Sequence, residues 1–318
     1  MKATIDRGLF LYICVIMKMI LELVWAIVGL STGFLRNAPD YEAGLDTQLL
    51  MGSVVQIDSA ERYWRHVTAM EPAYRGWINE LQLVTLSDEE LSEYLVAPKY
   101  ICIAGITDVF DKPSQSSPRI CDLVMGDILR RTGRKSGKWV QVILPSGQDG
   151  WVRGSEVAEF ERWARTRQPS AENILALAHK FLGSTYMWGG TSFKHVDCSG
   201  LTRSVYFMNG ILLPRDANQQ VRVGYEVGLD MDEWQPGDLV FFGTPQTEDA
   251  PLKAGHVAIY IGGGRIIHSS QLVRVSSLIE GTPDYYERKP IAVRRILGHV
   301  GEDNGTSDIR TNCWYFIQ

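Results

Sequence analysis

The sequence has few cysteines and little net charge, and both shortages exclude classes of protein. Its five cysteines, at positions 14, 102, 121, 198 and 313, are odd in number and widely spaced, so no disulfide framework is visible. No two of them lie close enough in the chain to complete a zinc site with histidines. A net charge of −5 gives no basic footprint for nucleic acid. The length of 318 residues predicts more than one domain.

Long apolar runs are also missing. Leu9 to Met17 is apolar throughout, which is long enough for the core of a signal peptide but too short to span a membrane. Lys18 and Glu22 add charges directly after this run, and Val24-Trp25-Ala26 is a candidate cleavage site. We therefore interpret residues 1–24 as a leader or a signal segment. The alternatives are an amphipathic leader and a start codon placed too early.

One cysteine lies where a reactive thiol is expected. A glycine pair, Gly189-Gly190, marks a turn, and after Cys198 the apolar residues recur with the spacing of a helix face, at Leu201, Val205 and Met208. Cys198 therefore lies at a helix N-terminus, where free N–H groups and the helix dipole are expected to lower a thiol pKa from about 8.5. The alternative is a buried, unreactive cysteine. The glycine turn and the polar neighbours favour the reactive thiol.

Two of the six histidines fall in one predicted β-hairpin. Residues 255–261 and 265–270 read as strands joined by three glycines. A three-residue loop places Ala258 opposite His268 and puts His256 on the same face of the sheet, whereas a two-residue loop would separate the histidines. We therefore predict that His256 is the general base for Cys198 and that His268 orients its ring. The alternative for each histidine is a structural strand residue.

Six motifs, in chain order, resemble the catalytic domain of the NlpC-type cysteine peptidases, which cut bacterial peptidoglycan peptides: YMWGG, DCSGL, LPRDANQQ, PGDLVFF, GHVAIYIG and IIHSS. The resemblance covers residues 169–318 and implies a papain-like α+β fold. It also implies Cys198 as nucleophile, His256 as base and His268 as the third member. By the same resemblance, Tyr186 lies at the oxyanion side, and the acyl-side pocket is lined by Asp197, Ser199, Arg215 and Asp216.

The chain before this domain reads as short strands separated by turns. Residues 26–35 and 53–57 are β-rich, residues 36–40 form a turn cluster, and residues 74–78 close the set. The arrangement resembles the bacterial SH3-like barrel that precedes the catalytic domain in γ-D-glutamyl-L-diamino acid endopeptidases, also called dipeptidyl-peptidase VI. We assign this barrel to residues 25–95.

Two stretches of this barrel are more specific than its fold. Residues 46–52, DTQLLMG, resemble the acidic-TQ motif of that subfamily, and residues 74–77, YRGW, resemble its YxGW motif, whose tyrosine reaches the peptidase cleft. The resemblance thus implies that Asp46 and Tyr74 bind substrate. Asp46 has one methylene fewer than the glutamate usual in the subfamily. The alternative for Tyr74 is an aromatic residue packed at a strand end.

The strand pattern begins again after an acidic, helix-prone linker at residues 87–95. We predict strands at 102–108, 127–130, 138–144 and 150–152. GKWVQV followed by DGWV indicates a second SH3-like barrel at residues 100–160, which can be a spacer. Residues 159–167 form a charged linker. A helix then starts at its N-cap, Ser170, with Ile174, Ala178 and Phe181 on one face.

These interpretations predict two small SH3-like β-barrels followed by a papain-like peptidase, active as a monomer without metal or cofactor. The expected reaction is hydrolysis of the γ-D-glutamyl bond in L-Ala-γ-D-Glu-L-Lys, or in its meso-diaminopimelate counterpart, with release of L-Ala-γ-D-Glu during cell-wall peptide recycling. A free N-terminal L-alanine is required on this view. The alternatives are an endopeptidase of intact peptidoglycan and a non-catalytic wall-binding protein. If residues 1–24 are a signal, the protein lies in the bacterial envelope (periplasm), and otherwise in the cytoplasm.

Overall fold

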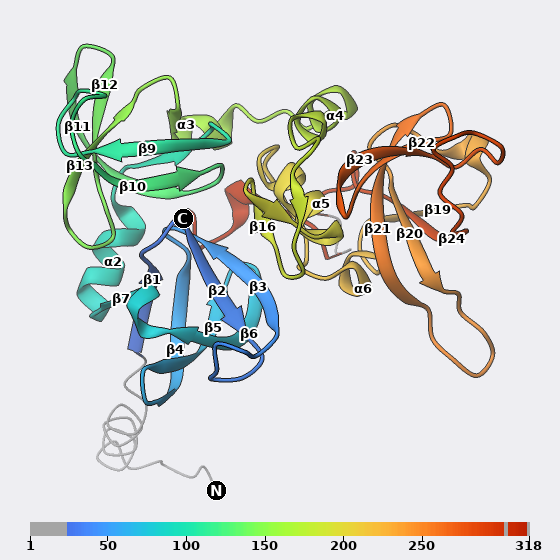
Figure 1. Ribbon diagram of the computed structural model, residues 1–318, viewed down its shortest axis with the longest axis horizontal. Coiled ribbons are helices and arrows are strands. Elements are labelled where there is room, and N and C mark those ends of the chain that lie inside the picture. Colours follow the sequence, from blue (N-terminus) through green and yellow to red (C-terminus); the bar gives the residue numbers. More distant parts are fainter. Residues whose placement is uncertain (1–23, 302–304, 317–318) are drawn as a thin grey trace, which may run out of the picture.

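The computed structural model describes residues 24–301 and 305–316 (Figure 1). The predicted leader lies outside the described residues except for its last residue, Val24. Three large sheets follow one another along the chain, and each has its own buried core. No helix within these ranges is long and apolar enough to cross a membrane.

The first sheet is antiparallel, with strand order β3-β2-β6-β5-β4-β1-β7. Its strands are β1 (Val24–Val28), β2 (Thr32–Arg36), β3 (Leu45–Leu50), β4 (Val54–Glu61), β5 (Trp64–Met70), β6 (Ala73–Asn79) and β7 (Leu83–Leu86). The core of this domain is formed by apolar residues from neighbouring strands, such as Val28, Leu35, Val55, Val67 and Ile78. The prediction of a β-rich run at 26–35 is confirmed, and a turn after Val28 divides this run into β1 and β2.

The second sheet repeats the first. Its order, β10-β9-β13-β12-β11-β8-β14, equals the first with every strand number raised by seven. Its strands are β8 (Lys99–Cys102), β9 (Ile106–Phe110), β10 (Arg119–Val124), β11 (Ile128–Ser136), β12 (Trp139–Ile143), β13 (Asp149–Arg153) and β14 (Val157–Glu159). The predicted strand 102–108 is again two strands, because the chain turns between Cys102 and Ile106. The prediction of a second module of the same kind agrees with this shared topology.

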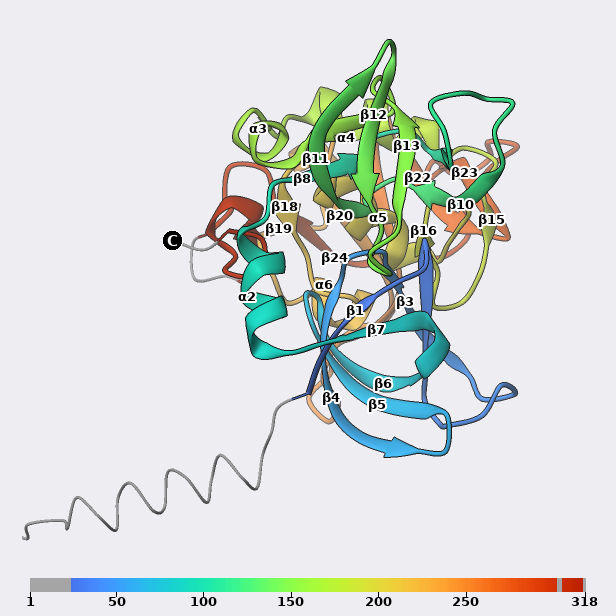
Figure 2. The ribbon, with the colours of Figure 1, turned by 90° about the vertical axis from the view of Figure 1, so that its left-hand side faces the viewer.

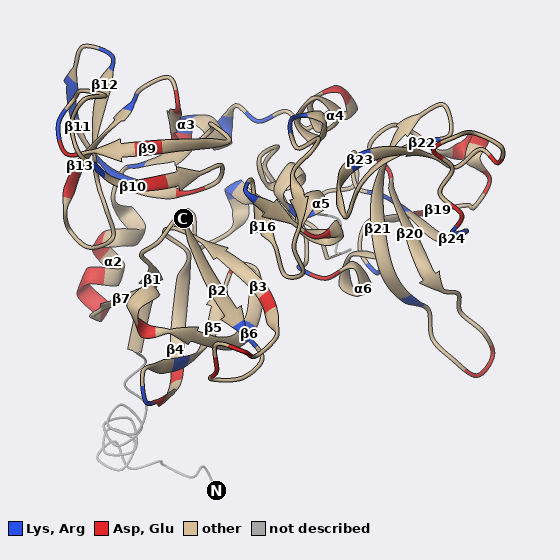
Figure 3. Cartoon of the chain, in the orientation of Figure 1, with Lys and Arg blue, Asp and Glu red and all other residues tan. Residues whose placement is uncertain are grey.

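Helices connect the three parts (Figure 2). Helix α2 (Asp88–Val96) fulfils the prediction of an acidic, helix-prone linker and is closed by a capping box between Ser87 and Glu90. Its acidic first turn is visible in Figure 3. The expected charged linker 159–167 instead contains helix α3 (Phe160–Arg165), because Phe160 and Trp163 are buried against the peptidase core.

The third sheet has nine strands in the order β16-β17-β15-β23-β22-β21-β20-β24-β19. Its strands are β15 (Thr185–Tyr186), β16 (Thr191–Ser192), β17 (His195–Val196), β19 (Tyr225–Val227), β20 (Leu239–Thr244), β21 (Lys253–Gly262), β22 (Arg265–Ser270), β23 (Leu272–Ser277) and β24 (Pro290–Arg295). A separate two-stranded sheet joins β18 (Ile211–Leu212) to β25 (Ser307–Asp308). A one-turn helix, α6 (Ala217–Gln220), and three short 3-10 turns, η1 (Glu80–Gln82), η2 (Met231–Glu233) and η3 (Ile309–Thr311), also occur in the described ranges.

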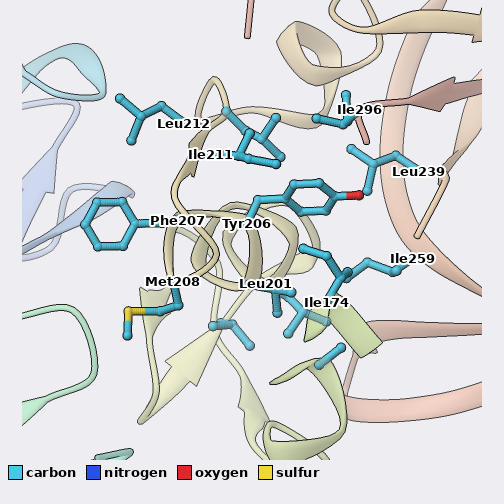
Figure 4. Packing of buried hydrophobic residues seen from close by; sticks show 14 of the residues in the cluster. Ile174, Leu201, Tyr206, Phe207, Met208, Ile211, Leu212, Leu239, Ile259 and Ile296 are labelled. Carbon is cyan, nitrogen blue, oxygen red and sulfur yellow. The ribbon is translucent and has the colours of Figure 1, made fainter. Parts of the chain in front are cut away.

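Helices α4 (Ala171–Lys180) and α5 (Cys198–Phe207) pack on one face of the nine-stranded sheet. Ser170 caps α4, and Ile174 and Ala178 are fully buried, as the sequence predicts. From α5, Leu201 packs into the same core, and the ring of Tyr206 points toward Leu239 (Figure 4). The core therefore fixes the direction of α5 and, with it, the position of the residue at its N-terminus.

The C-terminal segment ties the three parts together. The Trp314 ring lies 5.5 Å from that of Trp25 in the first domain, and the Tyr315 ring lies 5.7 Å from Phe160 in α3. The Tyr315 hydroxyl also donates to Glu71, whose carboxylate pairs with Arg203 of α5 at 2.6 Å. Both partners of this ion pair are only 10% exposed. The pair thus joins the first domain to the helix that carries Cys198.

Replacing Glu71 with alanine should destabilise the fold by about 3 kcal/mol, because the Arg203 charge is then left buried and unpaired. Urea unfolding followed by tryptophan fluorescence measures the effect. The matched control is Glu80→Ala, which breaks a more exposed pair with Arg65 in the same domain and should cost about 0.5 kcal/mol or less. Equal shifts in both variants would show that the Glu71 pair does not hold the domains together.

Candidate active site

Cys198 is the first residue of α5, as predicted, and Asp197 is its N-cap. One Asp197 oxygen accepts the Gly200 backbone N–H at 2.7 Å, and the other accepts the Gly189 N–H at 2.9 Å. A Cβ at Gly200 would lie 1.9 Å from the Gly190 carbonyl oxygen, so only glycine permits this approach. The glycine turn and the helix start are therefore packed directly against each other.

The expected lowering of the Cys198 pKa is wrong for the resting site. Burial, and then the Asp197 charge, raise the pKa of the Cys198 thiol to about 11. The backbone N–H of Ser199 in the first turn of α5 and that of Val257 in β21 lower the pKa, but their effect is smaller than that of burial and the Asp197 charge. The resting cysteine is therefore a neutral thiol, and it needs a base to become a nucleophile.

The histidine hairpin has the predicted register by a different route. Gly262 pairs with Arg265, which leaves a two-residue loop, and a register shift between Tyr260 and Gly262 restores the pairing. Ile259 then lies opposite Ile267, so Ala258 is opposite His268, and His256 shares their face. The bulge supplies the one-residue offset that a third loop residue was expected to supply, and so keeps both histidines on one face of the sheet.

The two histidines form a hydrogen-bonded relay. His256 Nε2 lies 2.8 Å from His268 Nδ1, and His268 Nε2 lies 3.0 Å from Ser276 Oγ. If each ring carries its proton on Nε2, each donates to the next group, and His256 Nδ1 is free to accept a proton. Ser276 was not predicted, because only the pairing of β22 with β23 brings it to His268.

Both histidines are neutral in the resting site. Burial, and then the charge of Arg288, lower the pKa of His256 to about 4, and burial lowers that of His268 to about 3. Cys198 and His256 both lie in the described range 24–301, and their side chains make no direct hydrogen bond to each other. Hydrogen bonds of this kind often form only with substrate bound. Tyr286, which sequence reasoning also missed, packs over both rings, with centroids 5.7 Å from His256 and 4.8 Å from His268.

Asp197 and Arg215 form a buried ion pair at 2.6 Å, with Arg215 only 2% exposed. Arg215 also donates to Ser199 Oγ at 3.0 Å. Both Asp197 oxygens are already occupied by this guanidinium and by two backbone N–H groups. The expectation that Asp197 and Arg215 line the substrate pocket is therefore modified, because their polar atoms are committed to the protein and hold the site together.

The first SH3-like domain meets the peptidase through its acidic-TQ motif. Thr47 accepts a hydrogen bond from Arg215 Nε at 2.7 Å. Gln48 accepts the Thr191 backbone N–H at 3.0 Å through its side chain, and its own N–H donates to the Gly189 carbonyl at 2.9 Å. Thr47 and Gln48 thus dock this domain on the glycine turn beside Cys198, a role that the motif alone did not reveal.

This docking brings together three predicted substrate-binding residues. The Tyr74 hydroxyl lies 3.4 Å from Asp216 Oδ2, across the boundary between the domains. Burial raises the pKa of Asp46 and of Asp216, and Asp216 adds to the rise at Asp46. Burial, followed by the charges of Asp216 and Asp46, raises the pKa of Tyr74 to about 12. Two carboxylates and a phenol therefore lie close together, and Arg215 acts on the pKa of all three in the opposite direction.

Tyr186 belongs to the same half of the site. Burial, and then the neighbouring Cys198 and Asp197, raise the pKa of its hydroxyl to about 12, so it remains a hydrogen-bond donor at neutral pH. Its proximity to the thiol agrees with the predicted oxyanion side. Cys198 thus lies close to Tyr186 and Asp197 and also close to the backbone N–H of Val257, the residue that follows His256.

Comparison with known proteins gives the family. Residues 183–295 match the model of the NlpC/P60 family. Residues 35–83 match the bacterial dipeptidyl-peptidase Sh3 domain, and residues 107–158 match the bacterial SH3 domain. The chain belongs to the NlpC/P60 family and is a cysteine peptidase with two N-terminal SH3 domains.

Several similar proteins match most of this chain. The γ-D-glutamyl-L-lysine dipeptidyl-peptidase of Bacillus subtilis (strain 168) is 37% identical over 258 residues, which cover 79% of this chain and 81% of that protein. Dipeptidyl-peptidase 6 of Lysinibacillus sphaericus is 31% identical over 82% of this chain and 94% of its own length. The crystal structure of an NlpC/P60 family protein from Bacillus cereus ATCC 10987 is similar with a TM-score of 0.71 and 26% identity, covering 85% of this chain and 99% of that one.

The relay predicts unequal effects of histidine substitutions. His256→Ala should abolish turnover, whereas His268→Asn, which can still hydrogen-bond the His256 ring, should retain a measurable part. Ser276→Ala should cost roughly tenfold in kcat, because it loosens only the far end of the relay. Steady-state kinetics on a common peptide substrate measures all three variants. A larger loss in His268→Asn than in His256→Ala would reverse the two roles.

Proposed function

We propose that this enzyme hydrolyses the γ-D-glutamyl bond to the diamino acid in peptidoglycan-derived peptides that have a free N-terminal L-alanine. The observation that carries the proposal is the cluster of Asp46, Tyr74 and Asp216 on the acyl side of Cys198. Names of similar proteins, dipeptidyl-peptidase 6 and γ-D-glutamyl-L-lysine dipeptidyl-peptidase, support the same bond and the same dipeptide product.

In the proposed reaction, Cys198 Sγ attacks the γ-carbonyl carbon of D-glutamate while its proton passes to His256 Nδ1. Backbone N–H groups at the start of α5, together with the Tyr186 hydroxyl, are suited to stabilise the oxyanion. His256 then gives its proton to the leaving amine, and the C–N bond breaks to leave a thioester. Water, deprotonated by His256, hydrolyses the thioester and restores the thiol.

The acidic cluster explains why a free amine is needed. A protonated amine that enters a half-buried cleft loses water, at a cost of several kcal/mol unless charged partners replace it. Asp46 and Asp216 supply two carboxylates, and Tyr74 supplies a phenol oxygen. An ammonium group between them would also offset the burial that raises the pKa of both carboxylates. The Asp46 side chain is one methylene shorter than the glutamate usual in the subfamily. Its charge nevertheless contributes to the raised pKa of Tyr74, so its carboxylate lies close to the other two residues of the cluster.

The alternative of a lytic endopeptidase requires substrates whose alanine amine is bound to the glycan. Such an amide carries no charge to match the acidic cluster, and the first SH3-like domain, docked through Thr47 and Gln48 beside the start of α5, is expected to obstruct a longer substrate. We therefore favour peptides already freed from the wall, a recycling role. The second alternative, a non-catalytic wall-binding protein, does not account for an intact thiol and histidine relay.

Acetylation of the substrate amine tests the proposal. We expect kcat/KM for the tripeptide L-Ala-γ-D-Glu-L-Lys to fall at least about a hundredfold on N-acetylation, roughly 2.7 kcal/mol, because the charge is lost. In Tyr74→Ala the same comparison should give a much smaller ratio. Tyr63→Ala, which removes an exposed tyrosine of the same domain, should keep the wild-type ratio. Equal cleavage of both peptides by the wild type would favour the endopeptidase.

A further inference from the structure

The position of the leaving group is set by the base. His256 must hand its proton to the leaving amine, so that nitrogen has to lie within hydrogen-bond reach of the imidazole. In the diamino acid, the carbon next to this nitrogen carries the α-carboxyl group. Whatever binds that carboxylate must therefore lie beside His256, on the side of Cys198 away from the acidic cluster.

Two arginines lie on this side. Arg288 precedes β24 by two residues, and the β24 residue Pro290 lies opposite Phe242, which in turn lies opposite His256. Arg288 is therefore at the end of the sheet that carries the base. Arg274 of β23 lies opposite His268 of β22. Tyr286, two residues before Arg288, packs over both histidine rings, and both arginines are close enough to act on its pKa.

Neither arginine is used by the rest of the protein. Both are exposed, and neither forms an ion pair or a side-chain hydrogen bond with any residue in the described ranges. Arg215, by comparison, is buried and committed to Asp197. Two free guanidinium groups close to Tyr286 and the histidines thus add positive charge to this side of the site.

Electrostatics divides the site in two at Cys198. Arg215 acts on the pKa of the acyl-side groups, Asp46, Tyr74, Asp216 and Tyr186. Arg288, in contrast, acts on His256 and Tyr286, and Arg274 acts on His268 and Tyr286. The acyl half matches an ammonium ion and the leaving half matches a carboxylate, so the two ends of a short zwitterionic peptide fit in only one direction.

We propose that Arg288, assisted by Arg274, binds the free α-carboxylate of the leaving diamino acid and so makes the enzyme prefer the free tripeptide. This inference rests on the proposed function and adds a specificity determinant on the leaving side. A guanidinium beside an exposed carboxylate contributes a modest free energy, which rises when the substrate displaces water from the pair.

The test compares L-Ala-γ-D-Glu-L-Lys with its C-terminal carboxamide, which has nearly the same size but lacks the charge. We expect the wild type to favour the free acid by about tenfold in kcat/KM, mainly through KM, which corresponds to about 1.4 kcal/mol. Arg288→Ala should lose most of this preference by cleaving the free acid less well, and Arg288→Lys should keep part of it. Lys289→Ala removes a neighbouring exposed charge and should behave as the wild type.

Each outcome distinguishes this inference from the function on which it rests. Efficient cleavage of both peptides at equal rates by the wild type would overturn the role of Arg288 and leave the proposed function standing. An equal loss on both peptides in Arg288→Ala would also overturn it, because the residue would then act only by supporting Tyr286 and the histidines. Cleavage of neither peptide by the wild type would remove the proposed function and this inference together.

Discussion

The buried ion pair between Asp197 and Arg215 is the interaction on which the site depends. Asp197 caps the helix that begins at Cys198 and also holds the glycine turn before it. Arg215 extends the same network to Ser199 and, across the domain boundary, to Thr47. Losing either partner would leave the other charge buried and unpaired, which costs several kcal/mol. One pair thus positions the nucleophile and the domain that covers it.

The electrostatics of the site favours a substrate-activated mechanism. The raised pKa of the Cys198 thiol and the lowered pKa of His256 both stabilise neutral forms in the free enzyme. Proton transfer between them creates two charges in a half-buried site, and it becomes favourable when a substrate brings an ammonium ion to the acidic cluster and a carbonyl to the oxyanion side. In this mechanism, a bound zwitterionic peptide completes the site.

Local patterns predicted the backbone structure around Cys198 and the two histidines. The glycine turn, the helix beginning at Cys198 and the register that puts His256 and His268 on one face are all encoded in residue spacing. Tyr286 and Ser276 were missed, because no motif or residue spacing marked their contacts: Ser276 reaches His268 through the pairing of β22 with β23, and Tyr286 lies in the irregular segment before β24.

Sequence reasoning was weakest where burial in the tertiary structure determines a segment's conformation, a side chain's partner or a pKa. The segment around Phe160 reads as a charged linker, yet it is a helix because its aromatic residues pack on the peptidase core. Asp197 was expected to meet the substrate, but a long-range partner, Arg215, occupies it. The lowered thiol pKa expected from the helix N-terminus was wrong for a similar reason, since burial outweighs the helix dipole.

Product analysis is the most direct test of the proposed reaction. Incubation of the full chain with L-Ala-γ-D-Glu-L-Lys, followed by mass spectrometry, should show an intact L-Ala-γ-D-Glu dipeptide and free lysine in equal amounts. Cys198→Ala should release neither product, because the nucleophile is absent. Release of free alanine with the γ-glutamyl bond intact, or equal dipeptide release by Cys198→Ala, would contradict this reaction.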